Sequence, residues 1–105
     1  MQPDSQIIEQ VVDRIVESIR PLRIILFGSA ARGEMGKDSD MDILVVMPEG
    51  THRMKTAQDL HIQLYGVPAA VDVLVATPSD LEKHKDNIGL IYKTILREGK
   101  DIYVA

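Results

Sequence analysis

The segment that decides the fold spans residues 22–47 and reads LRIILFGSAARGEMGKDSDMDILVVM. It begins and ends with short apolar runs, residues 22–27 and 41–47, that are rich in branched side chains. Runs of this length and composition are typical of strands buried on both faces. Gly28 stops the first run and a polar turn precedes the second, so the segment predicts two buried strands joined by a polar connection.

An amphipathic helix is predicted directly before this segment. Apolar residues recur with helical spacing from Ile7 to Ile19, and Asp4 or Ser5 is the expected N-cap. Pro21 cannot continue a helix and therefore ends it.

Further elements are predicted after the segment. Residues 70–76 form a third apolar run, bounded by Pro68 and Pro78. Between the second and third runs, residues 54–64 have a less regular helical pattern, with Gly66 as the expected C′ residue. The chain therefore alternates between helices and strands as far as this point.

The last part of the chain predicts a second helical region. The sequence Thr77-Pro78-Ser79-Asp80 is typical of an N-cap followed by proline and an acidic residue. Apolar residues on one face of the stretch that follows, up to Gly99, are Ile88, Ile91, Tyr92, Ile95 and Leu96. We interpret this face as core, or as a docking surface if it is only half covered. Residues 102–104 form either a short strand or a docked tail.

Composition limits the classes of protein that the chain can belong to. Its 105 residues, 1–105, are expected to form a single domain, too small to include a second domain that holds a substrate. It has no cysteine, no apolar run of membrane-spanning length and no secretory leader, so a cytoplasmic protein without a membrane association is expected. The net charge of −4 disfavours nucleic acid as a partner.

The polar connection contains a candidate anion site and a candidate metal site. Gly28 lets the backbone turn at the end of a strand, and after Ser29 a helix can begin whose free N–H groups bind phosphate. Asp40 and Asp42 are two residues apart on a strand, so their carboxylates leave the same face and repel each other unless a cation lies between them. Oxygen ligands of this kind suit Mg²⁺.

Asp72 is the third candidate carboxylate. It lies within an otherwise apolar strand, where an acidic side chain is costly unless it is paired or bound to metal. For Ser29 to meet Asp40, the first and second strands must be antiparallel, and for Asp72 to join them the third strand must be parallel to the second. A mixed sheet is therefore expected, in a fold of the α+β class.

The motif Gly28-Ser29…Arg32-Gly33…Ser39-Asp40-Met41-Asp42 resembles the signature of the DNA polymerase beta-like nucleotidyltransferase superfamily, and in particular its minimal nucleotidyltransferase branch of small prokaryotic proteins. The resemblance implies an αβ sandwich with a mixed sheet of three to four strands packed with helices. It also implies ATP as the substrate and two bound Mg²⁺ ions. The nucleotide-binding residues that it implies are Gly28, Ser29, Arg32, Gly33 and Ser39. The catalytic and metal-binding residues that it implies are Asp40, Asp42 and Asp72, of which Asp72 also activates the attacking hydroxyl.

The resemblance further implies a partner and a biological role. Members of this size are commonly encoded beside a HEPN-type toxin protein, act as its antitoxin, and modify one of its tyrosines with AMP. Two other functions stay open: a binding module that neutralises its partner by contact alone, and nucleotidyl transfer to a small molecule.

Structural roles are the alternative for several of these residues. Asp40 and Asp42 could cap the entry to a strand, and Asp72 could pair with a lysine or an arginine. Arg32 could contact phosphate or form a salt bridge to Glu34 or Asp38.

Overall fold

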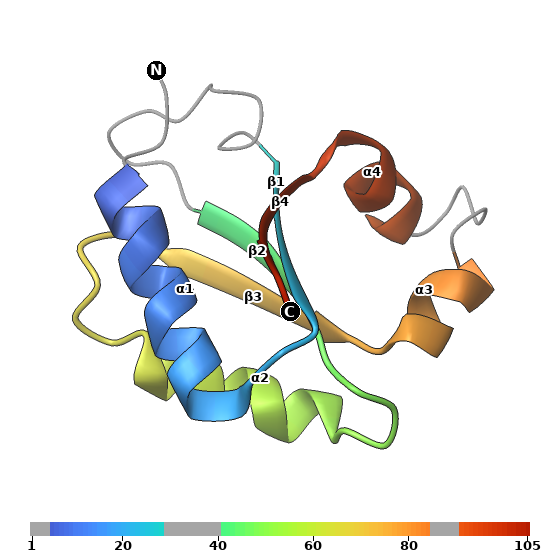
Figure 1. Ribbon diagram of the computed structural model, residues 1–105, viewed down its shortest axis with the longest axis horizontal. Coiled ribbons are helices and arrows are strands. Elements are labelled where there is room, and N and C mark those ends of the chain that lie inside the picture. The colour runs from blue at the N-terminus through green and yellow to red at the C-terminus, as the bar shows by residue number, and fades with distance from the viewer. Residues whose placement is uncertain (1–4, 29–40, 85–90) are drawn as a thin grey trace.

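Figure 1 shows the computed structural model, which describes residues 5–28, 41–84 and 91–105. In chain order its elements are α1 (Ser5–Ile19), β1 (Arg23–Phe27), β2 (Met41–Val46), α2 (Arg53–Gln63), β3 (Val71–Ala76), α3 (Pro78–His84), α4 (Ile91–Glu98) and β4 (Lys100–Val104). Asp4 and Ile88, which belong to predicted helical regions, lie outside the described residues. Within the described ranges, no helix is long and apolar enough to cross a membrane.

The described strands form one sheet in the order β3-β2-β1-β4. β1 is antiparallel to β2 and to β4, whereas β2 is parallel to β3. This arrangement confirms the mixed sheet and the α+β class predicted from the sequence. Of the two alternatives for residues 102–104, the strand is correct, because β4 pairs with β1 along its length.

Helices cover both faces of the sheet, so the fold has three layers (Figure 1). α1 and α2 lie on one face, and α3 and α4 lie on the other. Successive side chains of a strand point to opposite faces, and β1 accordingly contributes Ile24 and Leu26 to the core under α1 and Ile25 to the core under α4. Both faces of β1 and β2 are therefore buried, which explains their continuous apolar sequences.

The helical faces that pack on the sheet follow the predicted periodicity with two exceptions. In α1, Val11 and Ile15 are fully buried. Leu60 of α2 and the C-cap residue Leu64 are buried, but Met54 and Ile62 are 70% and 71% exposed and do not belong to the packed face. In α4, Ile95 is 1% exposed and belongs to the core, and the partly buried Tyr92 and Leu96 pack against the same core.

The beginning of α3 has the predicted capping arrangement. The Thr77 backbone N–H donates to Asp80 Oδ2 over 3.0 Å, and the Asp80 N–H donates to Thr77 Oγ1 over 3.4 Å. This reciprocal pair satisfies N–H groups that a helix leaves without internal partners. Glu49 adds a tertiary contact, because its carboxylate accepts hydrogen bonds from the Ser79 N–H at 2.7 Å and the Ser79 hydroxyl at 2.8 Å.

β3 differs from the prediction of a strand buried on both faces. Its residues alternate between partly buried and exposed over the first four positions, and Asp72 and Leu74 are the exposed ones. The reason is its place at the edge of the sheet, where the core under α3 and α4 includes only Ala76 of β3 and leaves the rest of that face of the strand exposed. The prediction was wrong because an apolar sequence does not reveal which strand lies at an edge.

Candidate functional site

Three strand ends meet at one end of the sheet. β1 reaches this end at Phe27, and β2 and β3 begin there. Phe27 lies opposite Asp42 in the antiparallel pair, and Asp42 lies beside Asp72 in the parallel pair. The pairing of the strands therefore brings together three of the residues predicted for the site, which are Gly28, Asp42 and Asp72.

The two carboxylates are neighbours on one face of the sheet. Asp42 and Asp72 share a register position, and neighbouring strands lie about 4.8 Å apart. Both side chains lie on the face of the sheet that includes Leu44 and packs against α3 and α4. Asp42 is half-buried and Asp72 is exposed, so this carboxylate pair is open to solvent. Two negative groups held this close favour the binding of a cation between them.

Gly28 closes the site from the side of β1. Its φ of +73° lies in the left-handed region, which side chains disfavour. A Cβ atom at this position would lie 2.5 Å from Asp42 Oδ2. Glycine is therefore required for two reasons, the backbone conformation and the space that the Asp42 carboxylate occupies.

Replacing Gly28 with alanine tests this close approach, and Gly50 provides a matched control. Gly50 has a φ of +88° but nothing within 4 Å of its hypothetical Cβ. We expect Gly50→Ala to lower the free energy of unfolding by about 1–2 kcal/mol, which is the cost of the backbone conformation alone. Gly28→Ala should lower it further and weaken the binding of Mg²⁺ with the ATP analogue AMP-PNP. Urea denaturation and calorimetry measure both, and equal effects of the two variants would show that the contact with Asp42 is unimportant.

The remaining predicted site residues lie outside the described part of the chain. These are Ser29, Arg32, Gly33, Ser39 and Asp40. Within the described part, no cluster of three or more metal-binding side chains is present, and two of the three predicted carboxylates belong to that part.

The described donors suit magnesium. Asp42 and Asp72 offer carboxylate oxygens, which are the protein ligands that Mg²⁺ prefers, and the site is open enough for water and phosphate to complete the coordination. Asp72 has no ion-pair partner among the described residues. Those residues therefore give no support to the alternative that Asp72 forms a structural salt bridge.

A hollow of about 530 Å³ lies between β3 and the beginning of α2, and no sequence pattern predicted it. It is lined by Val73, Leu74 and Val75 of β3 and by residues 51–54 and 57 at the beginning of α2. Leu74 follows Asp72 by two residues and shares its face of the strand. The hollow is lined by neither carboxylate, and α2 begins after the end of β2 that is opposite Asp42, so the hollow is separate from the candidate site.

Comparisons with solved structures find similar folds, of which three are described in this paragraph. A protein from Sulfolobus solfataricus described as a nucleotidyltransferase is 25% identical, with a TM-score of 0.57 over 77% of this chain and 73% of that one. A toxin–antitoxin structure with AMP-PNP has a TM-score of 0.63 at 20% identity, over 93% of this chain and 73% of that one. A mutant of the toxin–antitoxin MntA-HpeT has a TM-score of 0.59 at 20% identity, over 99% and 75%. At 20% identity, the last two similarities concern the fold alone.

Comparison with protein families gives the assignment. No curated protein matches the chain in sequence. The family described as the nucleotidyltransferase domain matches residues 6–102, which include all three strands that meet at the candidate site. The sheet topology agrees with this match, because the similar folds include a protein described as a nucleotidyltransferase. The chain therefore belongs to the nucleotidyltransferase domain family.

Proposed function

We propose that this nucleotidyltransferase domain transfers AMP from ATP to a tyrosine hydroxyl of a HEPN-type toxin and thereby acts as its antitoxin. The observation that carries the proposal is the pairing of Asp42 with Asp72 beside the turn at Gly28. Two adjacent carboxylates next to an open backbone turn provide what a triphosphate bound with magnesium requires.

Each predicted residue has a role in this proposal. Asp40, Asp42 and Asp72 would hold two Mg²⁺ ions, which when bound supply positive charge to the phosphates. The triphosphate would be held by the backbone at Gly28 and by Ser29, with Arg32, Gly33 and Ser39 completing the nucleotide site. Because Asp72 is the exposed member of the carboxylate pair, an acceptor arriving from solvent can reach it.

The proposed reaction is a displacement at the α-phosphorus. The hydroxyl oxygen of the acceptor forms a bond to the α-phosphorus, and the bond from that phosphorus to the bridging oxygen of the β-phosphate breaks. Pyrophosphate leaves with the electron pair of the broken bond. The hydroxyl proton passes to the Asp72 carboxylate and from there to water.

The comparisons support ATP as the donor and a toxin as the acceptor. One similar fold comes from a toxin–antitoxin structure that contains AMP-PNP, an analogue of ATP. Another comes from the toxin–antitoxin MntA-HpeT.

Labelled ATP tests the proposal directly. The purified chain is incubated with Mg²⁺ and ATP labelled at the α-phosphate, with and without the protein encoded next to it, and an Asp40→Asn/Asp42→Asn double variant is the control. We expect label on a tyrosine of the neighbouring protein, identified by mass spectrometry, and none with the double variant. Neutralisation of the partner by the double variant, without labelling, would instead support a binding module that acts by contact.

A further inference from the structure

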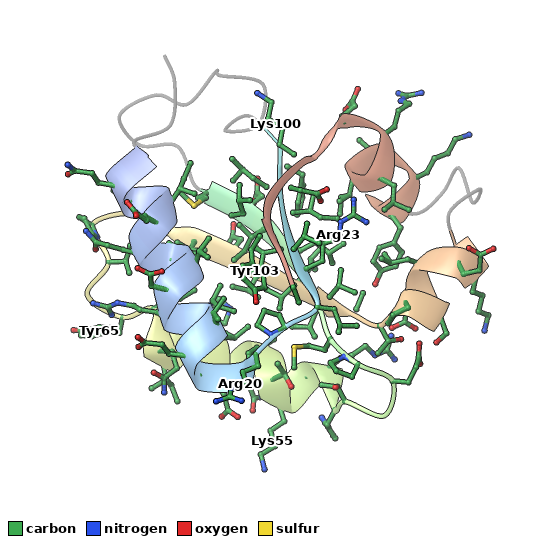
Figure 2. All side chains as sticks on the ribbon, viewed as in Figure 1. Arg20, Arg23, Lys55, Tyr65, Lys100 and Tyr103 are labelled. Carbon is green, nitrogen blue, oxygen red and sulfur yellow. The ribbon has the colours of Figure 1, made fainter. Side chains whose placement is uncertain are left out.

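The two edges of the described sheet differ in their protection against pairing with another chain. At the β4 edge, the register with β1 shifts between Ile24 and Ile25, and Lys100 is exposed. Figure 2 shows the Lys100 side chain extending away from the strands. A bulge and an exposed lysine both disfavour the addition of a strand. At the other edge, β3 pairs with β2 in unbroken register and has Asp72 as its one charged residue, so β3 is the less protected edge.

The free side of β3 presents the backbone groups of every second residue. The Met41 N–H donates to the Ala70 carbonyl at 2.8 Å. Because the direction of these groups alternates along a strand, the even-numbered residues of β3 face β2. The N–H and C=O groups of Val71, Val73 and Val75 therefore point to the other side, where no described strand lies. Such a row of backbone groups is a template for a further strand.

The hollow between β3 and the beginning of α2 lies along this free side. Its lining includes Val73, Leu74 and Val75 from β3 and Met54 from α2. Met54 is 70% exposed and Leu74 is 37% exposed, and removing apolar side chains of this size from water is favourable. An occupant that fits the edge therefore supplies both a strand and apolar side chains.

A second copy of the chain supplies both. In an antiparallel pair related by a two-fold axis, residues with outward backbone groups pair with each other, and opposite residues share a face. With the axis at Leu74, Val73 of each copy pairs with Val75 of the other, and the two Leu74 side chains lie opposite each other. The two Asp72 carboxylates are then roughly 14 Å apart along the strands. With the axis at Val73, each Asp72 would instead lie opposite a leucine and closer to its counterpart, so the axis at Leu74 is favoured.

The charges at the two ends of this edge are complementary. Asp72 lies at the beginning of β3, whereas Arg53 lines the hollow and lies 3.2 Å from Asp80, beyond the end of β3. The Arg53 side chain is 56% exposed, and Figure 2 shows Lys55 extending into solvent from the same end of α2. Antiparallel pairing brings the acidic end of each copy to the basic end of the other. Asp72 then lies opposite the small side chain of Ala76, which leaves the carboxylate pair accessible.

We propose that a second copy of this chain docks on the free side of β3, where the two β3 strands pair antiparallel about Leu74. The two sheets become one continuous sheet, and α2 of both copies lies on the same face of it. The pairing closes the hollow and covers Leu74. It requires no nucleotide and is independent of the function proposed above.

The oligomeric state of the full chain tests the proposal. Sedimentation velocity over a range of concentrations is measured for the parent, Leu74→Lys and Leu22→Lys. Leu22 is the matched control because it is a leucine of similar exposure, 39%, that lies outside the hollow. We expect dimers of the parent and of Leu22→Lys. Leu74→Lys should weaken the dimer by about tenfold or more, because like charges would lie opposite each other.

Two further variants test the register. A mixture of Leu74→Lys and Leu74→Glu should form mixed dimers, because the two introduced charges are then opposite in sign. Leu74→Cys should form a disulfide-linked dimer on oxidation, since opposite residues of this kind have Cα atoms about 4.5 Å apart, within the range of a disulfide. The chain has no cysteine of its own, and Leu22→Cys should give no such dimer.

Each contrary outcome overturns a stated part of the proposal. A monomeric parent overturns it outright, and loss of the neighbouring protein from Leu74→Lys would then assign this edge to that protein. Equal dimerisation of Leu74→Lys and the parent also overturns it, because the interface would lie elsewhere. A dimer that is lost in Leu74→Lys but forms no disulfide in Leu74→Cys overturns the register. Circular dichroism and urea denaturation check that each variant is folded.

Discussion

Replacing Asp42 with asparagine is expected to reduce nucleotidyl transfer by about a thousandfold or more while leaving the fold intact. Asparagine keeps the shape of the side chain but removes the negative charge that a metal-bound triphosphate requires. Asp42 lies in register with Asp72 and within reach of the Gly28 turn, so no other described carboxylate can take its place. The rate of transfer from ATP labelled at the α-phosphate measures the loss.

The same variant has an opposite effect on stability when metal is absent. Like charges on neighbouring strands are destabilising, by up to about 1 kcal/mol. Without Mg²⁺, Asp42→Asn should therefore be as stable as the parent or slightly more stable in urea denaturation. Asp59→Asn is the control, because Asp59 is exposed on α2 and should affect neither transfer nor stability. Transfer by Asp42→Asn at the parental rate would show that the proposed site is wrong.

Replacing Asp72 with asparagine is expected to reduce kcat by about a hundredfold or more, with a smaller effect on nucleotide binding than Asp42→Asn. In the proposed mechanism Asp72 accepts the proton of the attacking hydroxyl, and loss of a general base typically costs 10²–10⁴-fold. Its exposure is consistent with contact to an acceptor, since Asp42 is the more buried of the two. Single-turnover transfer and AMP-PNP calorimetry separate the two effects.

A double variant and a surface control complete the test of Asp72. Residues that act on one step give non-additive losses, so Asp42→Asn/Asp72→Asn should be little slower than Asp42→Asn alone. Asp13→Asn, at an exposed position of α1, should retain full activity. A purely structural role for Asp72 would instead appear as lower stability with an unchanged kcat.

Strand direction was predictable because it follows from the chemistry of the site. The requirement that a turn after residues 22–27 meet carboxylates at the beginning of residues 41–47 and 70–76 predicted one antiparallel and one parallel pair. The structure has both pairs, with Asp42 and Asp72 in register. The positions of Ser29 and Asp40, which lie outside the described residues, stay predictions.

Local sequence patterns predicted most of the described helices and strands, because those preferences depend on residues close together in the chain, but they left residues 102–104 open between a strand and a docked tail. The branched apolar runs predicted β1, β2 and β3, and the three-residue spacing of Thr77 and Asp80 predicted the start of α3. Such local patterns indicate whether a segment forms a helix or a strand, and they identify the residues that cap a helix.

The place of β3 at an edge of the sheet and the pairing of β4 with β1 are visible only in the folded structure. β3 is as apolar in sequence as β2, yet Leu74 is 37% exposed because β3 lies at the edge of the sheet and the core under α3 and α4 does not extend over this residue. Lys100 lies beside Leu26 because β4 pairs with β1, although the two residues are far apart in the chain. Pairing of this kind is set by the packing of the whole sheet between its helices, and no local pattern in the sequence contains it.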